Sequence, residues 1–166
     1  MANILMPHFQ VLACYNTKAN ARLYEACSQL SDFERKRIRP AFFKSIHGTL
    51  NHIMVSDRIW LTRFEGGQIP STGLDAIFYE DFEELRAARI TEDGQIEAFA
   101  ASLNENFLNE TIQYRNNSGQ IYTDPVVLLV AHFFNHQTHH RGQVHDMLMQ
   151  TEVAPPVLDM HRLIQP

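Results

Sequence analysis

The chain has 166 residues, of which 45% are hydrophobic and 20% are charged. This length is enough for one domain with its own core, and we expect residues 1–166 to form a single domain. Fourteen Lys and Arg against nineteen Asp and Glu give a net charge of −5. This balance argues against the strongly basic face of a nucleic-acid-binding protein, so we expect no nucleic-acid partner.

The first predicted helix runs from about residue 7 to residue 30. Its apolar side recurs every three or four positions and comprises Phe9, Ala13, Asn16, Asn20, Leu23 and Cys27. Buried amides need hydrogen-bond partners, so Asn16 and Asn20 would support a polar site in the core. In the alternative, the buried side is displaced by one position and both asparagines face water.

The second predicted helix runs from about residue 41 to residue 64, and the glycines and proline of "EGGQIPSTG" end it. Residues 71–91 read as a loop with a short helical piece, and a third helix is expected over about 91–110. Exposed apolar residues in the mixed segment would form a dimer face or fold back on the core; they are Ile77, Phe78 and Phe82.

A small β-hairpin and a fourth helix complete the predicted elements. Alternating apolar residues flank "NNSG" in "TIQYRNNSGQIYTDP", which is typical of a hairpin. The fourth helix would begin with Thr123 or Asp124 as N-cap and Pro125 at its first position, and would end near Gln150. Four amphipathic helices predict an all-α four-helix bundle. The long link between the second and third helices predicts one crossover connection.

Cysteine usage and the N-terminal sequence bear on the cellular location. Cys14 and Cys27 lie on one expected helix, about 20 Å apart at about 1.5 Å per residue, which is too far for a disulfide. The first residues lack a basic leader before a long apolar stretch, and no apolar run approaches the ~20 residues of a membrane span. We therefore expect a cytoplasmic protein with no membrane association.

The stretch "HFFNHQTHHRGQVHD" holds five of the nine histidines. At about 100° per residue, His132, His136 and His140 lie on one stripe of the fourth helix, with Leu129 and Met147 at its ends. Apolar residues at both ends indicate that the stripe faces the interior. His136 and His140 form an H-x-x-x-H pair that can bring two imidazoles to one cation.

A third ligand must come from another helix, and His52, near the middle of the second helix, is the best candidate. Its position is about 100° from the centre of the apolar side of that helix, so the helix geometry alone does not determine whether its side chain points into the interior. His132 could be a fourth ligand, a hydrogen-bond donor to a ligand or a pocket wall, and we favour the last two. His139 and His145 point away from the stripe.

Three neutral histidines and water suit a divalent metal, with Zn²⁺ or Ni²⁺ favoured and Mn²⁺ or Fe²⁺ as alternatives. Gln137 stands where zinc proteases of the H-E-x-x-H type carry their catalytic Glu, which argues against peptide hydrolysis by that mechanism. Asp57 could hydrogen-bond a ligand histidine or Arg141, but a plain ion pair or core hydrogen bond is the favoured role.

Three segments resemble the signature helices of the DinB/YfiT-like superfamily, and of the DinB family most closely: "YNTKANARLYEAC", "GTLNHIMVSDRIWLTRF" and "HFFNHQTHHRGQVHDML". The resemblance covers nearly the whole chain. It implies a four-helix bundle, often a homodimer, with a divalent metal on His52, His136 and His140. Superfamily members include thiol-dependent isomerases and transferases, but no residue of this chain identifies a thiol cofactor.

Two functions follow from this pattern. In the first, the protein is a metal-dependent enzyme acting on a small molecule, as an S-transferase, isomerase or hydrolase, with a substrate crevice beside His132, Asn16 and Asn20. In the second, it is a non-catalytic metal-binding or stress-response protein in which the three histidines are structural or sensory. A helical interaction module with an incidental histidine cluster is a third possibility.

Overall fold

The computed structural model describes residues 4–69, 72–116 and 118–164. Its four long helices are α1 (Leu5–Ser28), α3 (Ile46–Phe64), α4 (Phe82–Ser102) and α6 (Val126–Leu148). An antiparallel hairpin of β1 (Thr111–Arg115) and β2 (Ile121–Pro125) stands directly before α6. Short helices α2 (Asp32–Lys36), α5 (Glu105–Leu108) and α7 (Met160–Leu163) complete the described part of the chain. The predicted helical fold with a hairpin before the last long helix is confirmed.

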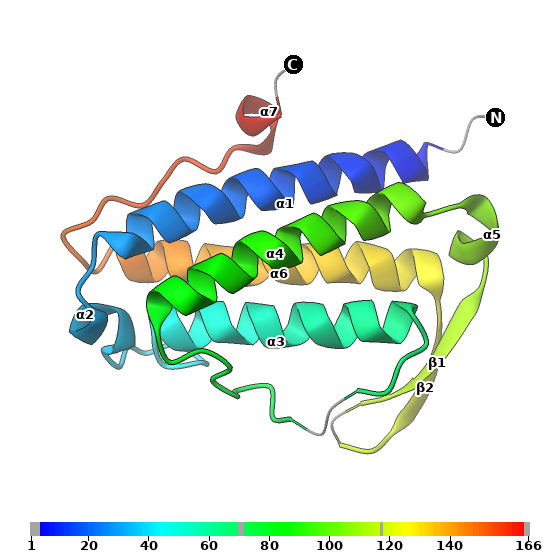
Figure 1. The fold of residues 1–166 in the computed structure, drawn as a ribbon, viewed down its shortest axis with the longest axis horizontal. Helices are drawn as coiled ribbons and strands as arrows, with labels where there is room; N and C mark the ends of the chain where they lie inside the picture. The colour runs from blue at the N-terminus through cyan, green and yellow to red at the C-terminus, as the bar shows by residue number, and fades with distance from the viewer. Residues whose placement is uncertain (1–3, 70–71, 117, 165–166) are drawn as a thin grey trace.

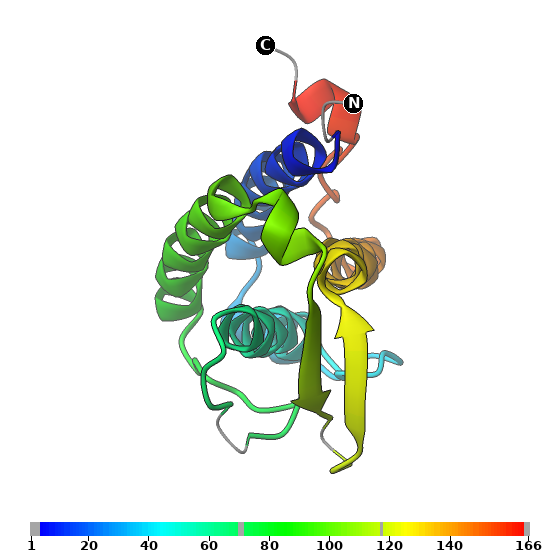
Figure 2. The same ribbon diagram turned by 90° about the vertical axis from the view of Figure 1, so that its right-hand side faces the viewer.

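The four long helices form a square bundle. Viewed along its length, α1 and α3 lie at opposite corners, and each of them packs against both α4 and α6 (Figure 2). In Figure 1, α1 and α6 run in one direction and α3 and α4 in the other. The link from α3 to α4 must therefore return along the length of the bundle, as the expected crossover does.

Helix α1 buries the predicted side. Asn16 and Asn20 are 1% and 2% exposed, so the alternative that places them in water is wrong. Cys14 and Cys27 are both free thiols on α1. The asparagines therefore enter the core through the same helical face as Phe9 and Leu23.

Helix α3 begins at Ile46 rather than near Ala41. The chain turns just before it, where Lys44 has a φ of 64°. Ser45 then caps the helix, because its Oγ accepts a hydrogen bond from Gly48 N at 2.9 Å. The predicted apolar side is buried throughout and comprises Ile46, Leu50, Ile53, Asp57, Trp60 and Phe64. Pro70, part of the predicted stop signal, lies outside the described residues.

The expected start of the third helix at Thr91 is wrong, because α4 begins at Phe82. Asp81 caps it by accepting a hydrogen bond from Glu84 N at 2.9 Å. The helix ends at Ser102, and α5 follows within the segment that was assigned to the third helix. Charged residues explain the error: Arg89, Glu92 and Asp93 are buried on α4 and interrupt its apolar periodicity.

The hairpin is confirmed in the described residues, with Thr111 opposite Pro125 and Arg115 opposite Ile121; Asn117 of the turn lies outside them.

The predicted cap of the fourth helix is wrong. Thr123, Asp124 and Pro125 belong to β2, and α6 begins at Val126.

Two contacts take the place of a side-chain cap at the start of α6. Val126 N donates to the carbonyl of Glu110 at 3.0 Å, and Asp124 accepts a hydrogen bond from the Tyr114 hydroxyl at 2.9 Å. The residue just before the hairpin therefore supplies a partner for the first backbone N–H of the helix, and the Tyr114–Asp124 bond holds together the strands that lead into it.

The core consists of two apolar clusters separated by a polar layer. One cluster gathers around Trp60, Phe133 and Ile96, and the other around Leu50, Leu85 and Met147. Between them, every long helix contributes buried polar residues. These are Asn16 and Asn20 of α1, Asp57 of α3, Arg89, Glu92 and Asp93 of α4, and Gln137 and Arg141 of α6. Among the described helices, none has a stretch long and hydrophobic enough to cross a bilayer.

The Ser45 cap gives a direct test of the corrected start of α3. Ser45→Ala removes the acceptor for Gly48 N and is expected to lower the free energy of unfolding by about 1 kcal/mol. Ser45→Asp keeps an acceptor and is expected to retain most of the wild-type stability. Urea denaturation measures both variants. Equal losses in the two would show that the cap does not stabilise this helix.

Candidate metal centre

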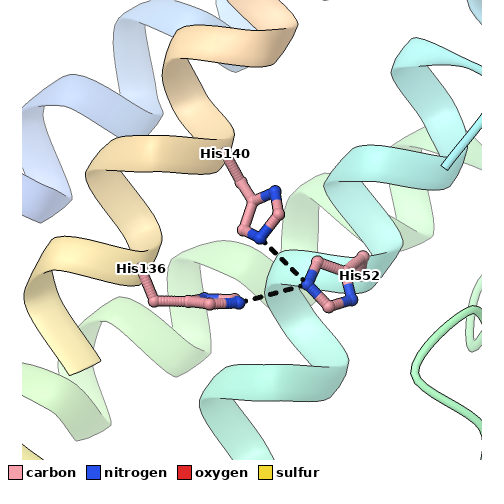
Figure 3. Close-up of side chains that lie close together, drawn as sticks. All are labelled: His52, His136 and His140. Carbon is pink, nitrogen blue, oxygen red and sulfur yellow. Dashed lines mark hydrogen bonds between the residues drawn. The ribbon is translucent and has the colours of Figure 1, made fainter. Parts of the chain in front are cut away.

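Three histidines from two helices meet beside the polar layer. Nε2 of His52, on α3, lies 3.2 Å from Nε2 of His136 and 3.2 Å from Nε2 of His140, both on α6. Figure 3 shows the three rings pointing toward one another. One potential ligand atom from each residue lies within 4.8 Å of the others. The one-turn spacing on α6 places two of the rings, and the side of α3 that faces α6 supplies the third.

Hydrogen bonds at the far ring nitrogens decide which nitrogens face the centre. Nδ1 of His52 lies 2.7 Å from the Leu74 carbonyl oxygen, and Nδ1 of His140 lies 2.7 Å from Oε1 of Gln143. Both partners only accept, so each Nδ1 carries the proton of the neutral ring. Nε2 of His52 and Nε2 of His140 therefore present lone pairs to each other at 3.2 Å. A cation between them turns this repulsion into coordination.

The third ring, His136, is less constrained. Its Nδ1 is buried and has no hydrogen-bond partner among the described residues. With the proton on Nδ1, its Nε2 also presents a lone pair to the centre; with the proton on Nε2, it donates to His52. The first of these tautomers completes a set of three ligands.

Burial keeps these rings neutral at pH 7. It lowers the pKa of His52 to about 4, against the partly opposing hydrogen bond to Leu74. Burial, and then the neighbouring His140 and His52, lower the pKa of His136 to about 3. The pKa of His140 is also lowered by burial. Neutral imidazole is the form that binds metal.

The spacing fits a metal ion. Tetrahedral ligands at about 2.05 Å from zinc are separated by about 3.3 Å, and the two Nε2 distances from His52 are 3.2 Å. Hydrogen bonding of Nδ1 to a carbonyl or amide oxygen is also the usual arrangement around a metal-bound histidine. His52, His136 and His140 could therefore hold a divalent cation.

One side of the cluster opens into a cavity of about 490 Å³. His52 and His136 line it, together with His132, Trp60 and Tyr122. On another side the cluster is covered, because the ring of Phe43 stacks on His52 at 3.7 Å between centroids. A bound ion would thus meet protein on one side and open space on another.

Larger cavities exist elsewhere, but they lack the chemistry of this one. A cavity of about 980 Å³ lies between α3 and α4, and one of about 1110 Å³ lies beside the hairpin. None of the nine histidines lines either of them. The histidine-lined cavity is therefore the place where a small molecule would meet the cluster.

Comparison with known proteins places the chain in a family. The family model described as the DinB family matches residues 2–166. The chain belongs to the DinB family. A curated relative, "Protein DinB" of Bacillus subtilis (strain 168), is 29% identical over 155 residues, which cover 87% of each chain. Family membership therefore extends over the bundle, the hairpin and the histidine cluster together.

His132 lies on the wall of the histidine-lined cavity. Its ring is 5.5 Å from that of Trp60 and 6.0 Å from that of His136, centroid to centroid. It does not belong to the cluster of potential ligand atoms. His139, which was expected to point away, is exposed.

Asn16 and Asn20 do not line this cavity, so the expected crevice beside His132, Asn16 and Asn20 is corrected. Each asparagine instead donates from Nδ2 to the same oxygen, Oδ1 of Asp93, at 3.0 and 2.9 Å. Their own amide oxygens accept hydrogen bonds from Arg141. They belong to the polar layer in the interior of the bundle.

Asp57 bonds neither to a ligand histidine nor to Arg141. Its Oδ2 pairs with Arg89 at 2.6 Å, and its Oδ1 accepts from Gln137 Nε2 at 2.9 Å. Burial raises the pKa of Asp57, while Arg89 and Gln137 favour its charged form. The favoured expectation of an ion pair and a core hydrogen bond describes this residue.

The polar layer connects directly to the ligands. Gln137 follows His136 and Arg141 follows His140 on α6, so the histidines of the cluster and the residues that join the layer alternate along one helix. Through Gln137 and Asp57 the layer ties α6 to α3, the helix that carries His52. This bond is a direct contact between the two helices that carry the histidine cluster.

Sequence reasoning missed several supporting residues. Phe43 and Leu74 lie in loops whose paths depend on the fold, and nothing in the sequence marks them. Gln143 could have been found, because it stands three residues after His140, on the same side of the helix. Arg89 and Asp93 carry an i,i+4 ion-pair pattern, but the expected boundary between the mixed segment, a loop with a short helical piece, and the third helix falls between them.

Arg89 tests the energetic role of the polar layer. Arg89→Met leaves Asp57 and Asp93 buried without their cation, and the free energy of unfolding is expected to fall by about 3–5 kcal/mol. The matched control is Arg86→Met, one turn earlier on α4, whose pair with Glu25 is largely exposed; about 1 kcal/mol or less is expected there. Similar losses in urea denaturation would contradict a special role for the layer.

The lowered histidine pKa values predict a pH dependence for the metal-free protein. Below pH 6.5 the unfolded chain protonates His136, whereas the folded chain does not until about pH 3. The free energy of unfolding of the wild type should therefore fall relative to that of His136→Asn by about 1.4 kcal/mol per pH unit between pH 6 and 4. Urea denaturation at several pH values gives the difference, and a constant difference would contradict the neutral buried ring.

Proposed function

We propose that the protein is a metal-dependent enzyme acting on a small molecule, with a divalent cation held by His52, His136 and His140. Zn²⁺ or Ni²⁺ is the favoured ion, and Mn²⁺ or Fe²⁺ is an alternative that three imidazoles also accept. The observation that carries the proposal is the convergence of three imidazoles, with Nε2 of His52 lying 3.2 Å from Nε2 of His136 and from Nε2 of His140. Two acceptors 3.2 Å apart in a buried site call for a cation between them.

Access to the cluster supports catalysis over a purely structural role. His52 and His136 both line the cavity, so a reactant can come close to the site of the ion. A bound divalent cation lowers the pKa of a coordinated water or holds a thiol as its thiolate. Three protein ligands with an open position are the usual arrangement of a catalytic site.

Residues around the cluster orient the histidine rings and shield them from water. Leu74 and Gln143 hold the rings of His52 and His140 in the ligating tautomer, and Phe43 shields one side from water. His132 and Trp60 form the wall where substrate would rest. A thiol S-transferase, an isomerase and a hydrolase are the reaction classes that this site suits.

A non-catalytic metal-binding role is the second candidate. It is favoured by the position of the cluster, which joins α3 to α6 at the level of the polar layer, where an ion would also stabilise the bundle. In that case chelation lowers the melting temperature strongly and no reaction is found. Turnover with low-molecular-weight thiols and electrophiles that depends on metal would decide for the enzyme.

A cytoplasmic location and a homodimer complete the proposal. Two free thiols, one of them buried, fit a reducing compartment. For the dimer face, Phe82 is ruled out because it is buried and stacks on Tyr24. Phe78 is half-buried, whereas the Ile77 side chain is 41% exposed. Ile77 is therefore the apolar residue of the expected set that remains a candidate for the dimer face.

His52→Ala tests the metal centre. Untagged wild-type protein is expected to contain about one divalent ion per chain. Removing one of three ligands should weaken metal binding by more than the about 10- to 100-fold lost when only a ligand's hydrogen-bond partner is removed. The control is His139→Ala, an exposed histidine next to His140, which should keep its metal. Elemental analysis measures all three proteins. A wild type without metal would refute the site, and turnover that survives His52→Ala would remove the metal from the mechanism.

A further inference from the structure

The cavity beside the histidines carries one charged side chain, that of Arg63. Its other lining residues are aromatic, aliphatic, hydroxyl, amide or imidazole groups, and within the described chain no Asp or Glu is among them. Among the described residues of the cavity wall, Arg63 is therefore the one with a permanent charge.

Arg63 is held in place by two aromatic rings. Its guanidinium carbon lies 4.6 Å from the centre of the Trp60 ring and 4.7 Å from that of Tyr114. One terminal nitrogen, Nη2, donates to the carbonyl of Arg115 at 3.1 Å. These contacts fix the plane of the group without neutralising its charge.

Within the described chain, no carboxylate pairs with Arg63, and its Nη1 donates to no protein group. Arg58, on the same helix, shows the contrast, because it pairs with Glu92 at 3.0 Å. Arginine stays protonated in proteins, so a half-buried guanidinium without a counter-ion favours an anion beside it. The rigid setting also lowers the entropy lost when that anion binds.

The placement of Arg63 relates it to the histidines. His52, Ser56, Trp60 and Arg63 follow one another at intervals of four, four and three along one face of α3, and all four line the cavity. The Cα atoms of His52 and Arg63 are about 16 Å apart along the helix axis. Helical side chains lean toward the N-terminus, which directs Arg63 toward the histidines.

The wall between these two ends is mostly apolar. Ile59, Trp60, Leu74 and Tyr122 contribute to it. Beyond Arg63 the wall continues into the cavity of about 1110 Å³, since Arg63, Tyr114 and Asn116 line both. A matching ligand is elongated, with an anionic end, an apolar body and a reactive group near the cluster.

We propose that this cavity binds a small carboxylic acid with an apolar body, and that Arg63 is the residue that recognises its carboxylate. That this acid is the substrate rests on the proposed metal-dependent function. A carboxylate fits better than a phosphate, because a single guanidinium with one free terminal nitrogen offers few donors for a dianion. Arg63 thereby becomes a specificity-determining residue remote from the reacting atoms.

The test compares two probes of the same shape that differ in charge, 3-phenylpropionate and 3-phenylpropanamide. Calorimetry with zinc-loaded protein measures their affinities. The acid is expected to bind about 10- to 100-fold more tightly than the amide, the range of a hydrogen bond to a charged group. Trp60, the only tryptophan of the chain, lines the cavity and should report binding through its fluorescence.

Three variants test whether Arg63 causes the preference for the acid over the amide. Arg63→Gln should bind acid and amide about equally, and Arg63→Lys should keep part of the preference, because it keeps the charge but loses the planar fork. Arg86→Gln removes a distant positive charge on α4 and should leave the preference unchanged. Circular dichroism and melting temperature verify that each variant is folded.

Several results would overturn the proposal. They are an undetectable affinity of the wild type for the acid, an equal or greater affinity for the amide, an acid preference that survives Arg63→Gln, and tighter binding of inorganic phosphate than of 3-phenylpropionate. If the acid bound the metal instead of Arg63, the Arg63→Gln variant would reveal it.

The metal content of the same preparations separates this inference from the proposed function. Protein that takes up no zinc, yet prefers the acid through Arg63, keeps the carboxylate site and refutes the metal centre. Protein that binds zinc but shows no Arg63-dependent preference keeps the metal centre and refutes the carboxylate site.

Discussion

The hydrogen bond from Gln137 to Asp57 joins the two helices on which the histidine cluster depends. It belongs to a layer in which Arg89 pairs with Asp57 and Asp93, while Asn16 and Asn20 join Asp93 to Arg141. Buried charges are costly unless they are paired and hydrogen-bonded, and here each long helix supplies part of the pairing. The layer therefore fits a single rotation and axial position of each helix, whereas an all-apolar core would tolerate small slides.

The fixed rotation and axial position of the helices matter for the histidine cluster, because a set of metal ligands tolerates only small errors in the positions of its atoms. Nε2 atoms on different helices must come within a few tenths of an ångström of the spacing that one ion imposes. His136 and Gln137 are neighbours on α6, as are His140 and Arg141, so a rotation of α6 that broke the layer would also turn the ligands away. The same helix thus presents one face to the core network and another to the cluster. Buried polar residues are reasonable where they position a functional site.

The two proposals describe opposite ends of one cavity. At the histidine end, neutral rings and facing lone pairs favour a cation; at the other end, a guanidinium between aromatic rings favours an anion. Both ends lie along the side of α3 that lines the cavity, and Tyr114 and Tyr122 of the hairpin contribute to the same wall. The hairpin therefore has two roles, since its strands also lead into the start of α6. An acid held at Arg63 would extend toward the cluster, which connects recognition with reaction.

Much of this could be predicted from the sequence, because period and spacing are local properties. The one-turn interval between His136 and His140, the alternation around the hairpin and the apolar side of α3 all follow from backbone geometry. The start of α4 could not be predicted, because its buried face is charged and its apolar periodicity is therefore broken. Asn16 and Asn20 were expected in the core, but their partner, Asp93, lies 73 or more residues away in sequence. The sequence alone determined the helices, the hairpin and two of the three potential ligands. Only the tertiary structure decided that His52 faces them, that Leu74 orients its ring and that no carboxylate among the described residues pairs with Arg63. Each of these depends on which segments distant in sequence come into contact.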